Sequence, residues 1–448
     1  MPPPVRPPGP KGHFLLGNLP ELGSDILGLF ASCARDHGDV AFLRLAGWPA
    51  FVLSHPEHIE QVLVTDHKNF IKHTFFWRHV RGIFGNGLLT SEGDFWLRQR
   101  RLAQPSFHRD RIAAYGDVMV SYTERAIDEW RDGESRDVHH DLMRLTLLIV
   151  AKVLFDADVA HEVETIGGAL DDATQEIASR FRRPFRIPDA IPIPGNLRYR
   201  RAVRRLDGVV HRIIDQHRSH DGRGDLLGLL MQARDEDGEA MSDTQLRDEA
   251  ITILLAGHET TALALSWTCY LLSKHPAVAE SIVAELTDVL GGARPPTVAD
   301  LPRLRFTEMV VMEAMRLYPP AYALGREAVK DCTIAGYEVR AGTSIFISPW
   351  VVHRDARWFE RPEEFLPERW AGNAAQRLPR FAYFPFGGGP RICIGNRFAM
   401  MEAVLLLACI IRRFRLVLDD EKGVALFPSI TLRPANGLRM TVRRRRSV

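Results

Sequence analysis

The sequence predicts one large, mainly helical domain with a small β-rich lobe, and three observations lead to this fold class. Helical periodicity dominates the chain from Tyr115 to Leu290. Short β-like runs lie outside that region. No internal repeat and no linker-like stretch divides the 448 residues, so we expect residues 1–448 to form a single domain with residues 1–12 as a proline-rich entry segment.

The β-rich lobe is predicted from short apolar runs. Val40–Leu45 and Ala50–Leu53 flank Gly47-Trp48-Pro49 and predict a hairpin, after which His55-Pro56 opens a helix. Further strands are expected at Cys332–Val339, Thr343–Ile347, Phe414–Leu418 and Leu438–Arg443.

The longest helix is predicted from Ser242 to about His275. Ser242 and Gln245 form a capping box, and Pro276 ends the helix. Roughly 33 residues at a rise of 1.5 Å would extend ~50 Å, enough to cross a domain. A second helix is expected at Leu304–Leu317, whereas the four prolines of Arg182–Gly195 predict a loop that breaks helical structure.

Composition excludes several classes of protein. The formal net charge of +2 argues against general attraction to nucleic acid. Five cysteines, odd in number and without paired spacing, fit a reducing, cytoplasmic compartment better than a disulfide framework. The proline-rich entry segment has no apolar run near the ~20 residues of a membrane span, so we expect no membrane anchor.

The most informative segment is residues 386–395, Phe-Gly-Gly-Gly-Pro-Arg-Ile-Cys-Ile-Gly, directly before a helix predicted from Asn396. A thiolate at Cys393 would be favoured by Arg391 and by the helix N-terminus, and thiolate is the metal-binding form of cysteine. The glycines let a flat group approach the backbone. For an isolated cysteine, an inert buried thiol in a turn would be the commoner interpretation.

Two further patterns place charge inside predicted helices. The run Ala256-Gly257-His258-Glu259-Thr260-Thr261 brings an acid and two hydroxyls into an apolar helix, which is costly unless they are hydrogen-bonded. A polar face toward water or a partner helix is the alternative. Glu313 and Arg316 stand three residues apart and can pair, although such pairs are usually exposed and contribute little.

Along the chain, the polar run at 256–261, the Glu313 and Arg316 pair and the cysteine segment follow one another in the order typical of the cytochrome P450 family, which the sequence resembles over nearly the whole chain. The resemblance implies the fold of that family and a haem b whose axial ligand is Cys393. Glu259 and Thr260 match the acid–alcohol pair that relays protons to bound dioxygen. Glu313, Arg316 and Arg369 match a buried structural triad, with Trp370 replacing the more usual phenylalanine in a change expected to be minor.

The resemblance also assigns residues to the cofactor and the substrate. Arginine forks and an indole N–H would bind the haem propionates, because a guanidinium recognises a carboxylate in a bidentate way. The implied cofactor contacts are Trp96, Arg100, Arg326, Phe386, Arg391, Gly395 and Ala256. The implied substrate-pocket residues are Phe75, Phe76, Phe84, Phe181, Leu324 and Ile430, although aromatic clusters are more often core than ligand-facing.

The implied activity is that of a monooxygenase that activates dioxygen and hydroxylates or epoxidises a hydrophobic small molecule, such as a fatty acid, terpene or other natural product. We expect no fused reductase domain, so a ferredoxin or flavodoxin with its NAD(P)H-dependent reductase would supply electrons, docking near Arg98, Arg101 and Arg397. A monomer is expected. The alternatives are a haem-thiolate enzyme that uses peroxide or rearranges its substrate, and a non-catalytic haem carrier or sensor. Relatives of the first kind typically lack the acid–alcohol pair.

Overall fold

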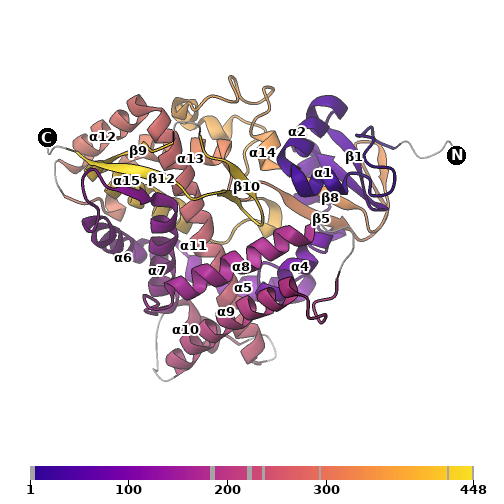
Figure 1. The fold of residues 1–448 in the computed structure, drawn as a ribbon, viewed down its shortest axis with the longest axis horizontal. Helices are drawn as coiled ribbons and strands as arrows, with labels where there is room; N and C mark the ends of the chain where they lie inside the picture. The colour runs from indigo at the N-terminus through magenta and orange to yellow at the C-terminus, as the bar shows by residue number, and fades with distance from the viewer. Residues whose placement is uncertain are drawn as a thin grey trace.

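The computed structural model describes residues 6–181, 187–218, 225–234, 238–291, 294–420 and 423–445. Helices make up most of the molecule, and a β-rich lobe formed with α1 and α2 lies at the right of Figure 1, near the N-terminus. The C-terminus lies at the opposite side, beside α12 and β9. This arrangement agrees with the mainly helical fold class and the small β lobe that the sequence predicts.

The helices are distributed along the whole chain. They are α1 (Leu19–Ser24), α2 (Ile26–His37), α3 (Pro56–Glu60), α4 (Phe75–Phe84), α5 (Gly93–Ala103), α6 (Arg109–Asp128), α7 (Val138–Phe155), α8 (Val163–Phe181), α9 (Pro194–Arg218), α10 (Leu226–Gln232), α11 (Asp243–Lys274), α12 (Pro276–Leu290), α13 (Arg305–Leu317), α14 (Pro349–Val352) and α15 (Asn396–Arg413). A π-helical turn follows α3 at Gln61–Thr65. Short 3-10 turns occur at His67–Asn69, Gln104–Phe107, Val298–Arg303, Pro367–Gln376 and Gly389–Arg391.

The strands form small sheets. They are β1 (Val40–Leu45), β2 (Trp48–Leu53), β3 (Phe70–Ile71), β4 (Ser135–Asp137), β5 (Leu324–Ala328), β6 (Cys332–Ile334), β7 (Tyr337–Val339), β8 (Ser344–Ile347), β9 (Phe414–Leu418), β10 (Leu426–Pro428), β11 (Leu432–Pro434) and β12 (Arg439–Arg444). The largest sheet has the order β1-β2-β8-β5-β3, in which β2 and β8 are parallel and the other pairs antiparallel. The others are the hairpins β6-β7 and β10-β11 and the sheet β4-β12-β9.

Several local predictions are confirmed and others need correction. The capping box at Ser242 begins α11, which ends before Pro276 as expected. The first hairpin turns earlier than predicted, since β2 already begins at Trp48 and includes Pro49. Pro49 lies opposite Arg44 of β1, before the pairing with β8 begins at Ala50, so its missing N–H interrupts no ladder.

The predicted helix-breaking loop at Arg182–Gly195 is too long at its C-terminal end. Pro194 is the first residue of α9, where proline is well tolerated because the first N–H of a helix has no intrahelical partner. Part of that loop lies outside the described residues. The strands β3, β4, β5, β10 and β11 were not predicted, since two to five residues carry too little periodicity.

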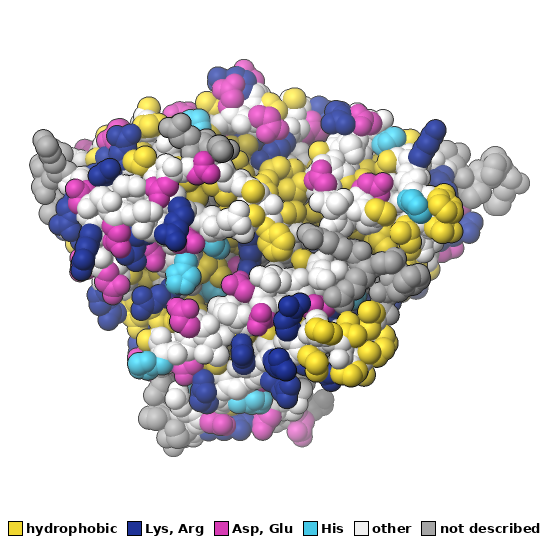
Figure 2. All heavy atoms as spheres, in the orientation of Figure 1, with side chains coloured by type: hydrophobic (Ala, Val, Ile, Leu, Met, Phe, Trp, Pro, Cys, Tyr) yellow, Lys and Arg dark blue, Asp and Glu magenta, His cyan; other side chains and the backbone are white. Residues whose placement is uncertain are grey.

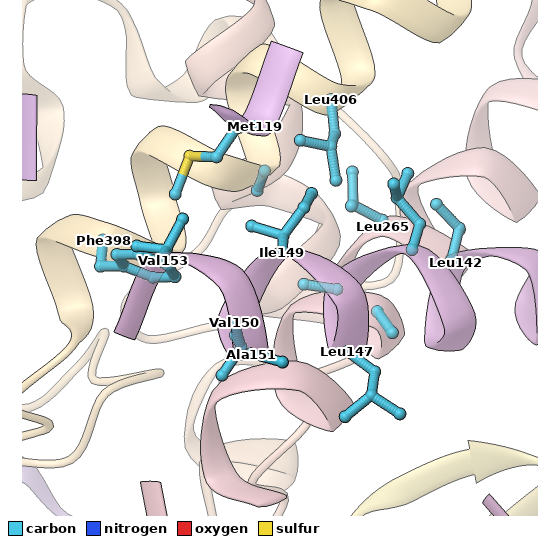
Figure 3. Packing of buried hydrophobic residues seen from close by; sticks show 14 of the residues in the cluster. Met119, Leu142, Leu147, Ile149, Val150, Ala151, Val153, Leu265, Phe398 and Leu406 are labelled. Atoms are coloured by element: carbon cyan, nitrogen blue, oxygen red, sulfur yellow. The ribbon is translucent and has the colours of Figure 1, made fainter. Parts of the chain in front are cut away.

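The main core lies where α7 packs against α11, and α15 packs against α6. Figure 3 shows Ile149 and Val153 of α7 meeting Met119 of α6 and Leu406 of α15. All four are almost fully buried. The middle of α11 carries the polar run at Glu259, and α15 begins directly after the Cys393 loop. This close packing fixes the two helices relative to each other. In the described part of the chain, no helix is both long and apolar enough to span a membrane.

Candidate active site

A single large cavity of about 890 Å³ brings together the segments that the sequence singles out. Its walls come from α4, α5, α11, β5, the β10–β11 hairpin and the loop that contains Cys393. Phe427 and Pro428 line the cavity and are partly exposed, and Figure 2 shows hydrophobic side chains gathered at the surface around β10. The cavity is therefore an interior apolar chamber that approaches the surface beside this hairpin.

The cysteine loop is held tightly beneath this chamber. The Cys393 N–H donates to the Phe386 carbonyl at 3.0 Å, which closes the loop just before α15. Gly389 has a φ of +65°, and a Cβ there would lie 1.9 Å from the Leu63 carbonyl oxygen, so only glycine allows this close approach to the π-helical turn. Cys393 faces the open space of the chamber, which Phe386 and Gly395 also line, while protein encloses its sulfur on the other sides.

The environment of the Cys393 thiol contains opposing influences. Burial raises the pKa of Cys393 above its ordinary value, whereas the Gly395 N–H and the charges of Arg100 and Lys72 act to lower it. A metal ion at the sulfur would add positive charge and favour the thiolate further. Arg100 is fixed by donating to the Ile392 carbonyl at 2.9 Å.

Next to this loop, cations crowd a buried corner of the chamber. Arg326 on β5 is buried, and its pKa is lowered to about 10 by burial and by the neighbouring Arg391. Burial also lowers the pKa of Arg391, whose guanidinium stacks on Trp96 at 4.2 Å from the ring centroid. Arg391 donates to Glu92 at 2.5 Å, but its Nη1 has no hydrogen-bond partner among the described residues. The corner therefore holds more positive charge than its own carboxylate balances.

Lys72 belongs to the same corner and was missed by the sequence reasoning. Its side chain is buried, Nζ donates to the Leu89 carbonyl at 3.0 Å, and burial followed by Arg326 and Arg391 lowers its pKa well below the ordinary value. Its position between Phe70-Ile71 and Phe75-Phe76-Trp77 was the available signal, because a lysine buried among such residues needs a partner.

These residues fit an iron porphyrin that bears two carboxylates. The Cys393 sulfur would be the ligand to the iron, and the buried cations, including the unpaired Nη1 of Arg391, would supply the counter-charge that two propionates need. Lys72, Trp96, Arg100, Arg326 and Arg391 all line the chamber, as Ala256 does from α11.

The polar run on α11 also reaches the chamber. Thr260 and Glu259 line it, and the Thr260 hydroxyl donates to the Ala256 carbonyl at 2.8 Å. Glu259 accepts from Thr431 at 2.5 Å and from Arg433 Nε at 2.7 Å. Burial would raise the pKa of Glu259, but Arg433 and Thr431 outweigh it and hold the pKa below its ordinary value.

The partners of Glu259 come from the β10–β11 hairpin, far away in sequence. Arg433 also donates from Nη1 to Asp171 of α8 at 2.8 Å. The acid is thus tied through one guanidinium to a side chain that is 61% exposed. Neither Arg433 nor Asp171 was foreseen, because no local pattern marks them.

The three residues of the expected triad meet in one network, in which Glu313 and Arg316 are fully buried and Arg369 is partly buried. Glu313 accepts from Arg316 and from Arg369 Nε, each at 2.9 Å. Arg316 donates in turn to the carbonyls of His353, Pro362 and Glu364. Trp370 needs a correction, because its indole N–H donates to Glu313 at 2.9 Å, so tryptophan here is a hydrogen-bonding member of the network and not a minor aromatic exchange.

Of the expected substrate-pocket residues, Phe76, Phe84, Leu324 and Ile430 line the chamber. The side chains of Phe75 and Phe181 lie outside the described part of the structure. Trp77 also lines the chamber, with its indole N–H donating to the Gly325 carbonyl at 3.1 Å, which joins α4 to β5.

Comparison with known proteins agrees with this geometry. The cytochrome P450 family model matches residues 7–439. The chain is 38% identical over 413 residues to cyclooctatin synthase of Streptomyces melanosporofaciens, covering 89% of each chain. It is 36% identical over 400 residues to pentalenene oxygenase of Streptomyces avermitilis, with 88% of each covered. It is also 36% identical over 421 residues to cyclooctat-9-en-7-ol 5-monooxygenase of S. melanosporofaciens, covering 92% of this chain and 91% of the relative.

A match over nearly the whole chain, together with the cysteine, cation and acid–alcohol groups around one chamber, fixes the class of this protein. An enzyme of this class requires a haem-thiolate cofactor, dioxygen and a source of electrons. The chain belongs to the cytochrome P450 family and is a cytochrome P450 monooxygenase.

Proposed function

We propose that this enzyme hydroxylates or epoxidises a terpene. The observation that carries the proposal is the chamber itself, whose walls above the cysteine loop are built from aromatic and aliphatic side chains such as Phe76, Phe84 and Ile430. An apolar chamber of this kind selects a hydrocarbon skeleton by shape. The names of the similar proteins, pentalenene oxygenase and cyclooctat-9-en-7-ol 5-monooxygenase, favour a terpene over a fatty acid.

In this proposal Cys393 ligates the iron of haem b, and the cationic corner binds its propionates. Arg326, Arg391 and Lys72 supply charge, Arg100 and Trp96 complete the corner, and Phe386, Gly395 and Ala256 bound the space for the ring. When bound, the haem-thiolate group supplies the activation of dioxygen. Glu313, Arg316 and Arg369 hold the irregular segment before the cysteine loop against α13.

We further propose that Glu259 and Thr260 deliver protons at the chamber. Glu259 Oε1 is held ionised between Thr431 and Arg433, so the carboxylate can take a proton only when that ion pair loosens. Thr260 Oγ1 donates to the Ala256 carbonyl and keeps acceptor capacity toward the chamber. In this proposal a proton passes through Glu259 Oε1 and Thr260 Oγ1.

For the electron supply we propose a ferredoxin or flavodoxin with its NAD(P)H-dependent reductase. Arg101 and Arg397 are exposed and lie close in sequence to Arg100 and Cys393, so they suit an acidic protein. We also propose that the chain works as one domain, as a monomer, in the cytoplasm, consistent with five free cysteines.

The first test is the carbon monoxide difference spectrum of the dithionite-reduced protein, compared with a Cys393→His variant. A strongly red-shifted Soret band that the variant loses supports thiolate ligation. Wild-type and Thr260→Ala proteins are then supplied with NADPH, a ferredoxin and its reductase, ¹⁸O₂ and a panel of cyclic terpenes or fatty acids. One labelled oxygen in a terpene product, with less product per NADPH in Thr260→Ala, is expected.

The same experiment separates the alternatives. Turnover with hydrogen peroxide alone, equal to that with the redox partners, would indicate a peroxide-using or rearranging enzyme. A correct carbon monoxide spectrum without turnover by either route would indicate a haem carrier or sensor. Labelled fatty acid products without terpene products would contradict the proposed substrate class.

A further inference from the structure

The segment that joins α4 to α5, residues 85–92, has no helix or strand of its own, yet it forms one wall of the chamber. Leu88 and Leu89 of this segment line the chamber next to Phe84. A substrate recognised by shape requires a wall that stays in place. Because residues 85–92 form no helix or strand, contacts from other elements must hold them in place.

Two adjacent acidic side chains near the start of α11, Asp248 and Glu249, accept hydrogen bonds from its backbone. The Asn86 N–H donates to Asp248 Oδ2 at 2.7 Å, and the Leu88 N–H donates to Glu249 Oε2 at 2.9 Å. Both acids are buried, with 6% and 1% of their surface exposed. Without them, two buried backbone donors would be unsatisfied, which is costly.

The approach of the segment to α11 is as close as the backbone allows. Gly85 has a φ of +57°, and a Cβ at this position would lie 2.1 Å from Asp248 Oδ1. Glycine is therefore required here both by conformation and by space. Thr90 closes the segment on itself, since its hydroxyl donates to the Gly85 carbonyl at 2.8 Å.

Arg247 holds the Asp248 side chain in place and connects it to α9. Arg247 pairs with Asp248 at 2.8 Å and donates from Nε to Asp207 of α9 at 2.8 Å. Thr252, Ala256 and Thr260 line the chamber from α11, and Thr252 lies one turn after Asp248. Twelve residues at 1.5 Å per residue place Asp248 about 18 Å along the helix from Thr260.

We propose that Asp248 and Glu249 are specificity-determining residues, which act by clamping residues 85–89 as a fixed wall of the substrate chamber. This inference rests on the proposed function only for the identity of the substrate. The clamp selects bulky, rigid molecules by keeping the distance between this wall and the reacting end of α11 constant. Asp248 and Glu249 are positioning residues, because they act through Leu88 and Leu89 and not on the substrate.

The test uses the haem-loaded protein, an Asp248→Ala variant and Asp243→Ala as the matched control. Asp243 is an aspartate in the first turn of the same helix, but its side chain is 74% exposed. In hydrogen–deuterium exchange, we expect the amides of Asn86 and Leu88 to exchange at least about tenfold faster in Asp248→Ala and unchanged in the control. This readout does not depend on any activity.

Ligand size provides the second readout. Spectral titration with imidazole and with 1-dodecylimidazole measures binding next to the haem. In Asp248→Ala we expect the affinity for imidazole to stay the same and the affinity for 1-dodecylimidazole to change by about tenfold, because only its long alkyl chain extends along α11 as far as the wall. Asp248→Asn, which keeps an acceptor oxygen, is expected to restore most of the wild-type ratio.

Gly85→Ala tests the clamp from the other side, because it leaves both carboxylates intact and pushes the segment away from Asp248. It should reproduce the exchange and ligand-size effects. Unchanged amide exchange in both Asp248→Ala and Gly85→Ala would overturn the proposal. So would an equal change for both ligands, since a general loss of structure does not discriminate by size. Failure of terpene turnover with these effects intact would contradict the proposed function and leave the clamp standing.

Discussion

Glu402 offers a direct test of how burial sets the charge state inside this protein. It lies on α15, fully buried, and the polar group that faces its carboxyl is the Thr261 hydroxyl of α11. Burial raises the pKa of Glu402 to about 8 from an ordinary 4.5, and the nearby Thr261 hydroxyl offsets only part of that effect. The carboxyl is therefore neutral at pH 7 in the folded protein and ionised in the unfolded chain.

This difference makes stability depend on pH with a known sign. A group whose folded pKa is raised contributes stability that is present below pH 4.5 and is lost as the pH rises toward 8. Each pH unit in this window lowers the free energy of unfolding by about 1.4 kcal/mol, which amounts to about 5 kcal/mol across the window. With an unfolding entropy of roughly 2.1 cal/mol/K per residue, a chain of 448 residues gives about 0.9 kcal/mol per degree, so the window corresponds to ~5 °C in Tm.

The assay compares wild type with Glu402→Gln by calorimetry at one scan rate, at half-unit steps from pH 5 to 9. The variant lacks the titrating group, so its Tm should rise relative to wild type by about 1.5 °C per pH unit up to pH 8 and then level off. A constant packing cost of glutamine displaces the whole curve without changing this slope. Glu164→Gln, at a side chain that is 83% exposed, serves as control. Parallel curves for Glu402→Gln and wild type would refute the reasoning.

Three further predictions concern the other buried charges. Glu313→Gln removes the carboxylate that balances Arg316, so we expect a loss of about 3–5 kcal/mol, seen as a Tm lower by several degrees together with weaker haem retention; an unchanged Tm would contradict a stabilising network. Arg433→Met removes the main group that lowers the pKa of Glu259, so the pH profile of product formed per NADPH should shift upward, and an identical profile would separate Arg433 from proton delivery. Lys72→Met removes one cation from the propionate corner, so haem transfer to apomyoglobin should be about tenfold faster, with Arg101→Met, an exposed cation, as the control that leaves it unchanged.

Much of the fold was predictable because the signals are local. The start of α11 at the Ser242 capping box and its stop before Pro276 are set by residues within one turn of each helix end. The small strands were predicted less well, since β4 and β10 owe their existence to pairing with β12 and β11 and not to their own residues.

The cysteine loop was predictable for the same local reason. Its glycines, arginine and cysteine all lie within residues 387–393, so their order alone limits what can approach the backbone. Glu259 and Thr260 were noticed because polar residues in an apolar helix are costly, and Glu313 and Arg316 because a helix places them side by side.

Only the tertiary structure decided which hydrogen-bond donor each buried acid meets. The sequence by itself determined the helical fold class, the cysteine and the acid–alcohol pair, because each depends on neighbours within a few residues. It could not show that Arg433 holds Glu259, that Trp370 donates to Glu313 or that Asp248 grips Asn86. These partners lie 57 to 174 residues apart, and their pairing depends on how the helices and hairpins pack, which no local pattern records.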